Sequence, residues 1–171
     1  SGMHFPESTV SLEKAKERLG FEELFGLTLA SLLNKQQFMH DSGVKVVFDQ
    51  TLAKQFTASL PYRLTNAQRK VVWQIYKDIE STTPMNRLVE GDVGSGKTAV
   101  AAMAAVMVIA NKYQVAFMAP TGLLAAQHFD SLTKLLAPVG LDKKIALLVG
   151  SMKQAQKKKI HERVKKGEID L

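Results

Sequence analysis

Apolar and polar residues alternate in blocks along the chain, and the period of each block predicts an element. Apolar residues recur at helical spacing from Leu12 to about residue 37, and a second, short helix is expected over 51–59. From residue 65 onward, helical patterns alternate with short apolar runs that are typical of strands. The expected helices are 65–80, 97–111, 122–136 and 152–166, and the expected strands are 87–90, 114–119, 144–149 and a last one from Ile169.

This alternation of strands and helices predicts an α/β fold. A parallel sheet with helices on its faces is the usual arrangement for such an order. The longest apolar run, Ala99 to Ala110, has 12 residues. A membrane span needs about 20, so we interpret this run as a buried helix and expect neither a membrane partner nor a location outside the cytoplasm.

The charge of the chain is concentrated near its end. Lys and Arg number 23 against 16 Asp and Glu, a net charge of +7. Nine of these basic residues lie between Lys143 and Lys166, where Glu162 is the single acidic residue. Such an excess favours a polyanionic partner, although a solvated helix face explains the same residues. The chain has no cysteine, which excludes disulfides and thiolate metal sites.

The strongest chemical signal is a glycine-rich stretch that matches G-x-x-x-x-G-K-[ST] between the expected strand 87–90 and the apolar helix from Lys97. Its glycines let backbone N–H groups approach phosphate oxygens, and the first turn of the helix adds further free N–H groups. We expect Lys97 to bind the β- and γ-phosphates of a nucleotide and Thr98 to bind Mg²⁺. A glycine-rich turn with a solvated lysine is the alternative. The stretch reads Gly91-Asp92-Val93-Gly94-Ser95-Gly96-Lys97-Thr98.

A second candidate group precedes this stretch. The Gln68 side chain carries a donor and an acceptor that suit the edge of an adenine, and Tyr62 is placed to stack on the base. Thr65 and Gln68 also fit a capping box, in which both side chains only close the start of a helix. The sequence leaves both interpretations open.

A third candidate group is Ala119, Pro120 and Thr121, at the end of the expected strand 114–119. Free N–H groups at the start of the next helix suit a phosphate of a nucleic-acid backbone. Thr121 as a simple helix cap explains the same residues.

Taken together, these motifs resemble the RecG family of ATP-dependent DNA helicases, superfamily 2 translocases that remodel stalled replication forks and Holliday junctions. The resemblance covers nearly the whole chain and rests on Leu64–Gln68, Met85–Thr98, Met118–Thr121 and, upstream, His4–Pro6 and Ala15–Leu24. It implies a partial RecA-like sheet that binds ATP and Mg²⁺. Residues 1–60 would be a helical linker before the motor, and residues 61–171 the first part of the ATP-binding domain, truncated before the Walker B motif.

The resemblance also implies roles for single residues. Lys97 and Thr98 would be the catalytic phosphate and Mg²⁺ residues, and Gln68 with Tyr62 would recognise adenine. Residues 119–121 would contact the backbone of branched DNA during recombination and repair. Gly122 and Ala126 stand where the family often has Glu, so no side-chain role is carried over to these two positions.

Further expectations concern activity and association. The resemblance implies a monomeric parent protein, whereas this part alone is expected to be inactive as an ATP hydrolase. Because strand 87–90 would have unpaired edges, we expect the isolated chain to self-associate or to displace that strand. Two other functions remain open at this point: a small P-loop phosphotransferase and a nucleotide-gated binding module.

Overall fold

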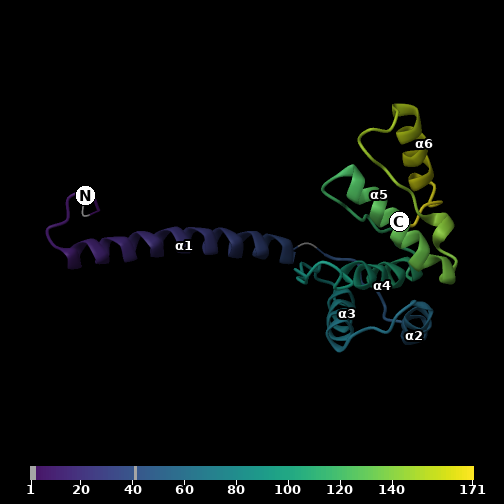
Figure 1. Ribbon diagram of the computed structural model, residues 1–171, viewed down its shortest axis with the longest axis horizontal. Coiled ribbons are helices and arrows are strands. Elements are labelled where there is room, and N and C mark those ends of the chain that lie inside the picture. The colour runs from purple at the N-terminus through teal and green to yellow at the C-terminus, as the bar shows by residue number, and fades with distance from the viewer. Residues whose placement is uncertain (1–2, 41) are drawn as a thin grey trace. The chain divides into compact units, whose positions relative to one another are not determined.

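The computed structural model describes residues 3–40 and 42–171, and it divides the chain into two units, Ser1–Ser42 and Gly43–Leu171. The first unit contains one long helix, α1 (Thr9–His40), shown in Figure 1. Its start is capped by two serines: Ser11 N–H donates to Ser8 Oγ at 3.1 Å, and Ser8 N–H donates to Ser11 Oγ at 3.0 Å. Among the described residues, no helix combines the length and the apolar character that a membrane crossing needs.

The second unit is built from helices joined by irregular segments. Each helix lies where the apolar spacing predicts one, to within a few residues. They are α2 (Gln50–Ser59), α3 (Asn66–Ile79), α4 (Lys97–Ala110), α5 (Gly122–Leu136) and α6 (Gln154–Lys165), with the short 3₁₀ turns η1 (Ala137–Val139) and η2 (Asp142–Lys144).

The core of this unit forms around α4, which contacts α2, α3 and α5 (Figure 1). The sequence of α4 is apolar on all sides beyond its first two residues, and such a helix is stable only when it is surrounded. Phe56 of α2, Ile75 of α3 and Leu136 of α5 are buried in the same cluster as Met103 and Met107 of α4. Burial of each such side chain stabilises the fold by roughly 1.5–3 kcal/mol.

The predicted parallel sheet is wrong, because the described residues contain no β-strand. A strand is defined by consecutive hydrogen bonds to a neighbouring segment, and sequence alternation does not supply that neighbour. The segments 87–90, 114–119, 144–149 and 169–171 are all irregular. Within the described chain, no backbone–backbone hydrogen bond joins residues 87–90 to another segment. Self-association of the isolated chain stays a prediction.

Three of the other segments do meet, but only through isolated bonds. Val115 N–H donates to Asp170 O at 2.8 Å, and Ala146 N–H donates to Leu171 O at 2.9 Å. Asp170 N–H donates to Lys144 O at 2.8 Å. The last residues of the chain therefore lie between two segments that come from before and after α5, without a continuous ladder on either side.

Some of the irregular segments are held by side-chain hydrogen bonds instead of by a β-ladder. Asn111, which ends α4, pairs with the backbone of Val47: its Oδ1 accepts from Val47 N–H at 2.9 Å, and its Nδ2 donates to Val47 O at 3.0 Å. Arg87 pairs with Asp78 of α3 at 2.5 Å, and this hydrogen bond raises the pKa of the Arg87 guanidinium. The end of α4 thus holds the segment before α2, and the end of α3 holds the segment that follows it.

Tyr76 of α3 is the one buried phenol in the described core. Its hydroxyl donates to Met103 O of α4 at 3.2 Å, and burial raises the pKa of Tyr76 to about 12. Below pH 10 the phenol is neutral in both the folded and the unfolded chain. As the pH rises from 10 towards 12, the unfolded chain releases the proton first, so the free energy of unfolding falls.

We expect Tyr76→Phe to reduce this alkaline loss of stability. The variant should be about 1 kcal/mol less stable than the parent at pH 8, because the hydrogen bond to Met103 is lost. The difference should shrink between pH 10 and pH 12, since the variant has no phenol to ionise at this position. Urea denaturation across this pH range measures it, and a difference that stays constant with pH would contradict the account.

Candidate functional site

The start of α4 differs from the starts of three other helices in this unit, α2, α3 and α5. These three begin with a side chain that accepts a hydrogen bond from the first turn: Asp49, Thr65 and Thr121. The residue before α4 is Gly96, which has no side chain to do so. Among the described residues, no acceptor binds the N–H groups of Gly96, Lys97 or Thr98. Free donors at the positive end of a helix form a binding site for an anion.

The conformation of the glycine loop (Gly91–Thr98) depends on glycine at specific positions. Gly94 has a φ of 80° and Gly96 a φ of 83°, in the left-handed region that other residues rarely adopt. A Cβ on Gly91 would lie 2.6 Å from Ser95 Oγ, and a Cβ on Gly96 would overlap the side-chain amide of Gln68. The loop therefore packs too closely for side chains at either position.

Lys97 folds back onto the glycine loop. Its ammonium group donates to Gly91 O at 2.5 Å and to Asp92 O at 2.8 Å. These carbonyls hold a full positive charge beside the helix start that carries the free N–H groups. Thr98, the next residue, is half-buried in the first turn of α4. The arrangement gathers positive charge and hydrogen-bond donors, and among the described residues no carboxylate side chain is in bonding contact with them.

Gln68 connects the start of α3 to the glycine loop. The capping box is confirmed: Gln68 Oε1 accepts from Thr65 N–H at 2.8 Å, and Gln68 N–H donates to Thr65 Oγ1 at 3.2 Å. In addition, Gln68 Nε2 donates to Ser95 O at 2.7 Å. The structural interpretation of Gln68 thus holds, and the same side chain also fixes the position of the loop. One amide hydrogen of Gln68 has no partner among the described residues.

Tyr62 lies in a separate depression, of about 460 Å³, between the end of α2 and the start of α3. Its side chain is 45% exposed. Arg69 also lines this depression, whereas no residue of the glycine loop does. The sequence analysis did not identify Arg69 as a candidate site residue. Its position, directly after Gln68 and one helical turn after Thr65, is the signal in the sequence that could have indicated it.

Residues 119–121 precede α5 and are not joined to the glycine loop by any hydrogen bond in the part of the chain that the structure describes. Thr121 Oγ1 accepts from Leu124 N–H at 3.2 Å, so the capping interpretation of this residue holds. Met118, immediately before them, is 91% exposed. The structure therefore brings Gln68 to the glycine loop and leaves Tyr62 and residues 119–121 at other places on the surface.

Comparisons with known proteins agree with these motifs. RecG of Bacillus subtilis, an ATP-dependent DNA helicase, is 43% identical over 171 residues, which cover 99% of this chain and 25% of the relative. RecG of Thermotoga maritima is 41% identical over 170 residues, which cover 99% of this chain and 22% of the relative. The structure of RecG bound to a three-way DNA junction matches with a TM-score of 0.83 and 41% identity, over 99% of this chain and 23% of that one.

The resemblance to RecG that the sequence predicts is therefore confirmed, and the chain spans about a quarter of the length of the relatives it matches. Residues 65–170 match the DEAD/DEAH box helicase family. This match covers more than half of the chain and includes Gln68, the glycine loop and Thr121. The chain belongs to the DEAD/DEAH box helicase family.

Proposed function

We propose that the chain is the ATP-binding portion of an ATP-dependent DNA helicase that remodels branched DNA. The observation that carries this proposal is the set of free N–H groups at Gly96, Lys97 and Thr98, at the start of a helix that no side chain caps. Membership of the DEAD/DEAH box helicase family supports it. Relatives named ATP-dependent DNA helicases, one of them solved with a three-way DNA junction, support DNA as the partner.

The glycine loop would hold the phosphates of ATP, and Thr98 would supply a hydroxyl oxygen to Mg²⁺. An oxygen ligand suits this cation, and Mg²⁺ is usually bound through few protein ligands together with the phosphates. The bound Mg²⁺ would neutralise the negative charge that develops on the phosphates during hydrolysis. Lys97 would exchange its bonds to Gly91 O and Asp92 O for bonds to phosphate oxygens, which are stronger acceptors because they carry charge.

The base of the nucleotide would lie beside Tyr62 and Gln68. Support comes from the half-exposed Tyr62 ring, from the depression that it shares with Arg69, and from the remaining amide hydrogen of Gln68. The aromatic ring and the guanidinium both offer flat surfaces for stacking. Gln68 would then contact the base and Ser95 of the glycine loop at the same time.

Residues 119–121 would contact the DNA backbone, with residues 1–60 as the linker and 61–171 as the first part of the motor. The Thr121 hydroxyl accepts from Leu124 N–H and keeps its own hydrogen to donate to a phosphate. Capping and phosphate contact are therefore compatible at this residue. Pro120 and Thr121 are both exposed.

We expect Lys97→Ala to weaken Mg·ATP binding at least tenfold, because a charge-assisted hydrogen bond contributes about 1.5–3 kcal/mol. Isothermal titration calorimetry on the 171-residue chain measures this. Lys54→Ala removes the same charge from an exposed position of α2 and should leave the affinity unchanged. Both variants should keep the thermal unfolding midpoint of the parent within a few degrees. Equal ATP affinity in Lys97→Ala and the parent would overturn the nucleotide site.

A second prediction separates backbone strain from loop packing. Gly96 and Gly140 both have positive φ, 83° and 73°, so alanine at either position costs about 1–2 kcal/mol. Only at Gly96 would the new methyl group overlap Gln68; nothing lies within 4 Å of a Cβ on Gly140. We expect Gly96→Ala to weaken Mg·ATP binding severalfold and Gly140→Ala to leave it unchanged in the same titration. A loss of affinity shared by both variants would mean that the Gln68 contact does not matter.

A further inference from the structure

A strongly basic surface on α6 takes no part in the proposed nucleotide site. We define the basic face as two pairs of neighbouring exposed lysines, the last of which directly follows the helix: Lys158, Lys159, Lys165 and Lys166. The opposite side of the helix faces the chain, where Ile160 and Val164 line a cavity beneath α6. The one acidic residue within α6, Glu162, lies between the two pairs, so the face keeps a clear positive excess.

The side chains of three other basic residues of this region have partners within the described chain, and those of the basic face do not. Lys157 donates to Gly150 O at 2.8 Å, Arg163 pairs with Glu168 at 3.3 Å, and Lys144 pairs with Asp170 at 3.0 Å. No side-chain hydrogen bond or ion pair of the basic face occurs among the residues that the structure describes. The four ammonium groups outnumber the single carboxylate of Glu162, and this excess of positive charge favours an external polyanion.

The spacing of the two pairs suits a nucleic-acid backbone. Residues seven apart on an α-helix are separated by about 10.5 Å along its axis. Successive phosphates of one DNA strand rise by about 3.4 Å each, so the two pairs would span about three nucleotides. Lysine binds phosphate as a point charge without base specificity, which suits a surface that follows DNA of any sequence.

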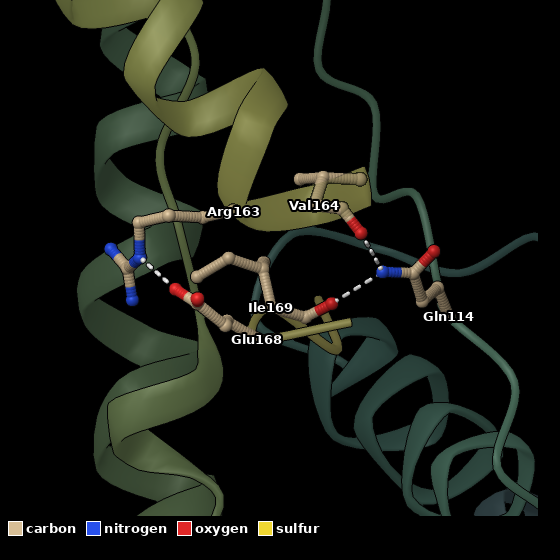
Figure 2. A network of polar contacts seen from close by, with 5 residues as sticks. All are labelled: Gln114, Arg163, Val164, Glu168 and Ile169. Carbon is tan, nitrogen blue, oxygen red and sulfur yellow. Dashed lines mark hydrogen bonds and ion pairs between the residues drawn. The ribbon is translucent and has the colours of Figure 1, made fainter. Parts of the chain in front are cut away.

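The last turn of α6 is tied to the segment that follows α4. Figure 2 shows Gln114 between two carbonyls: its Nε2 donates to Val164 O at 2.9 Å and to Ile169 O at 2.7 Å. Near the start of α6, Lys157 is bonded to Gly150 O. Gln114 begins the segment that leads to residues 119–121, so one side chain joins α6 to the proposed DNA-contacting segment. A basic face that is already positioned loses less entropy on binding.

We propose that the basic face of α6 binds the phosphate backbone of a DNA duplex, independently of sequence and in addition to residues 119–121. The choice of DNA as the polyanion rests on the proposed helicase function. An acidic protein surface is the competing partner, and the experiment below distinguishes the two.

The test is the salt dependence of DNA binding by the 171-residue chain. The face variant carries Lys→Gln at all four positions: Lys158, Lys159, Lys165 and Lys166. A control variant makes the same change in net charge at four exposed lysines elsewhere: Lys14, Lys16, Lys54 and Lys70. Fluorescence anisotropy with a labelled duplex and a labelled three-way junction, from 50 to 200 mM salt, gives the slope of log K against log [salt]. Thermal unfolding checks that both variants are folded.

We expect the slope of the face variant to be smaller by about 3 to 4, since each phosphate contact contributes about 0.9. Its affinity at 50 mM salt should fall at least tenfold, and the control variant should keep the parent's slope. Equal slopes in both variants, or no DNA binding by the parent chain, would overturn the proposal. Binding of polyglutamate as tight as that of duplex DNA, and lost in the face variant, would overturn it in favour of an acidic protein.

The nucleotide site is assessed separately in the same preparations. Mg·ATP binding should be the same in the parent, the face variant and the control variant, because the basic face holds no residue of the glycine loop. Absence of ATP binding in all three would contradict the proposed helicase function, while the slopes would still decide whether α6 binds a polyanion.

Discussion

The need to bury α4 on all sides is the constraint on which the rest of the second unit depends. The only polar residues of this helix are Lys97 and Thr98, both in its first turn. The remaining residues gain stability only if other elements surround them, and α2, α3 and α5 do so. The polar start of the helix is then left at the surface. The candidate anion site at this position therefore follows from the same sequence pattern that builds the core.

The site also depends on how α3 and α4 start. Because α3 packs against α4, its capping box lies next to the glycine loop, and Gln68 belongs to both. A single side chain thus satisfies an N–H group of α3 and holds Ser95 O of the loop. The close approach requires glycine at position 96, where a methyl group would overlap the amide. Changes at the proposed nucleotide site would therefore reach the start of α3 through one hydrogen bond.

Local patterns explain which features the sequence predicts correctly. The helical period and the Thr65–Gln68 box predict α3, and the glycine spacing predicts the loop, because these features involve residues within one or two turns of each other. The bond from Gln68 to Ser95 joins positions 27 residues apart, and those from Gln114 span 50 and 55 residues. No local pattern contains such contacts.

The predicted strands failed for the same physical reason. Alternation along 87–90 or 114–119 says which side chains are apolar, and it does not say which backbone lies alongside. In the structure, the anchors of the irregular segments are side chains such as Asn111 and Arg87. Tyr62 and Gln68 were predicted as a pair, yet the structure gives them different surroundings. Whether they act together on one base stays a prediction.

The central claim is that the free N–H groups of Gly96, Lys97 and Thr98 bind the phosphates of a nucleotide. The most direct measurement is the change in their ¹H–¹⁵N NMR shifts when Mg·ATP is added, compared with adenosine. We predict large shifts at these three amides with Mg·ATP and none with adenosine, while the capped starts of α2, α3 and α5 change little. Shifts of equal size with adenosine, or shifts confined to other helix starts, would contradict the claim.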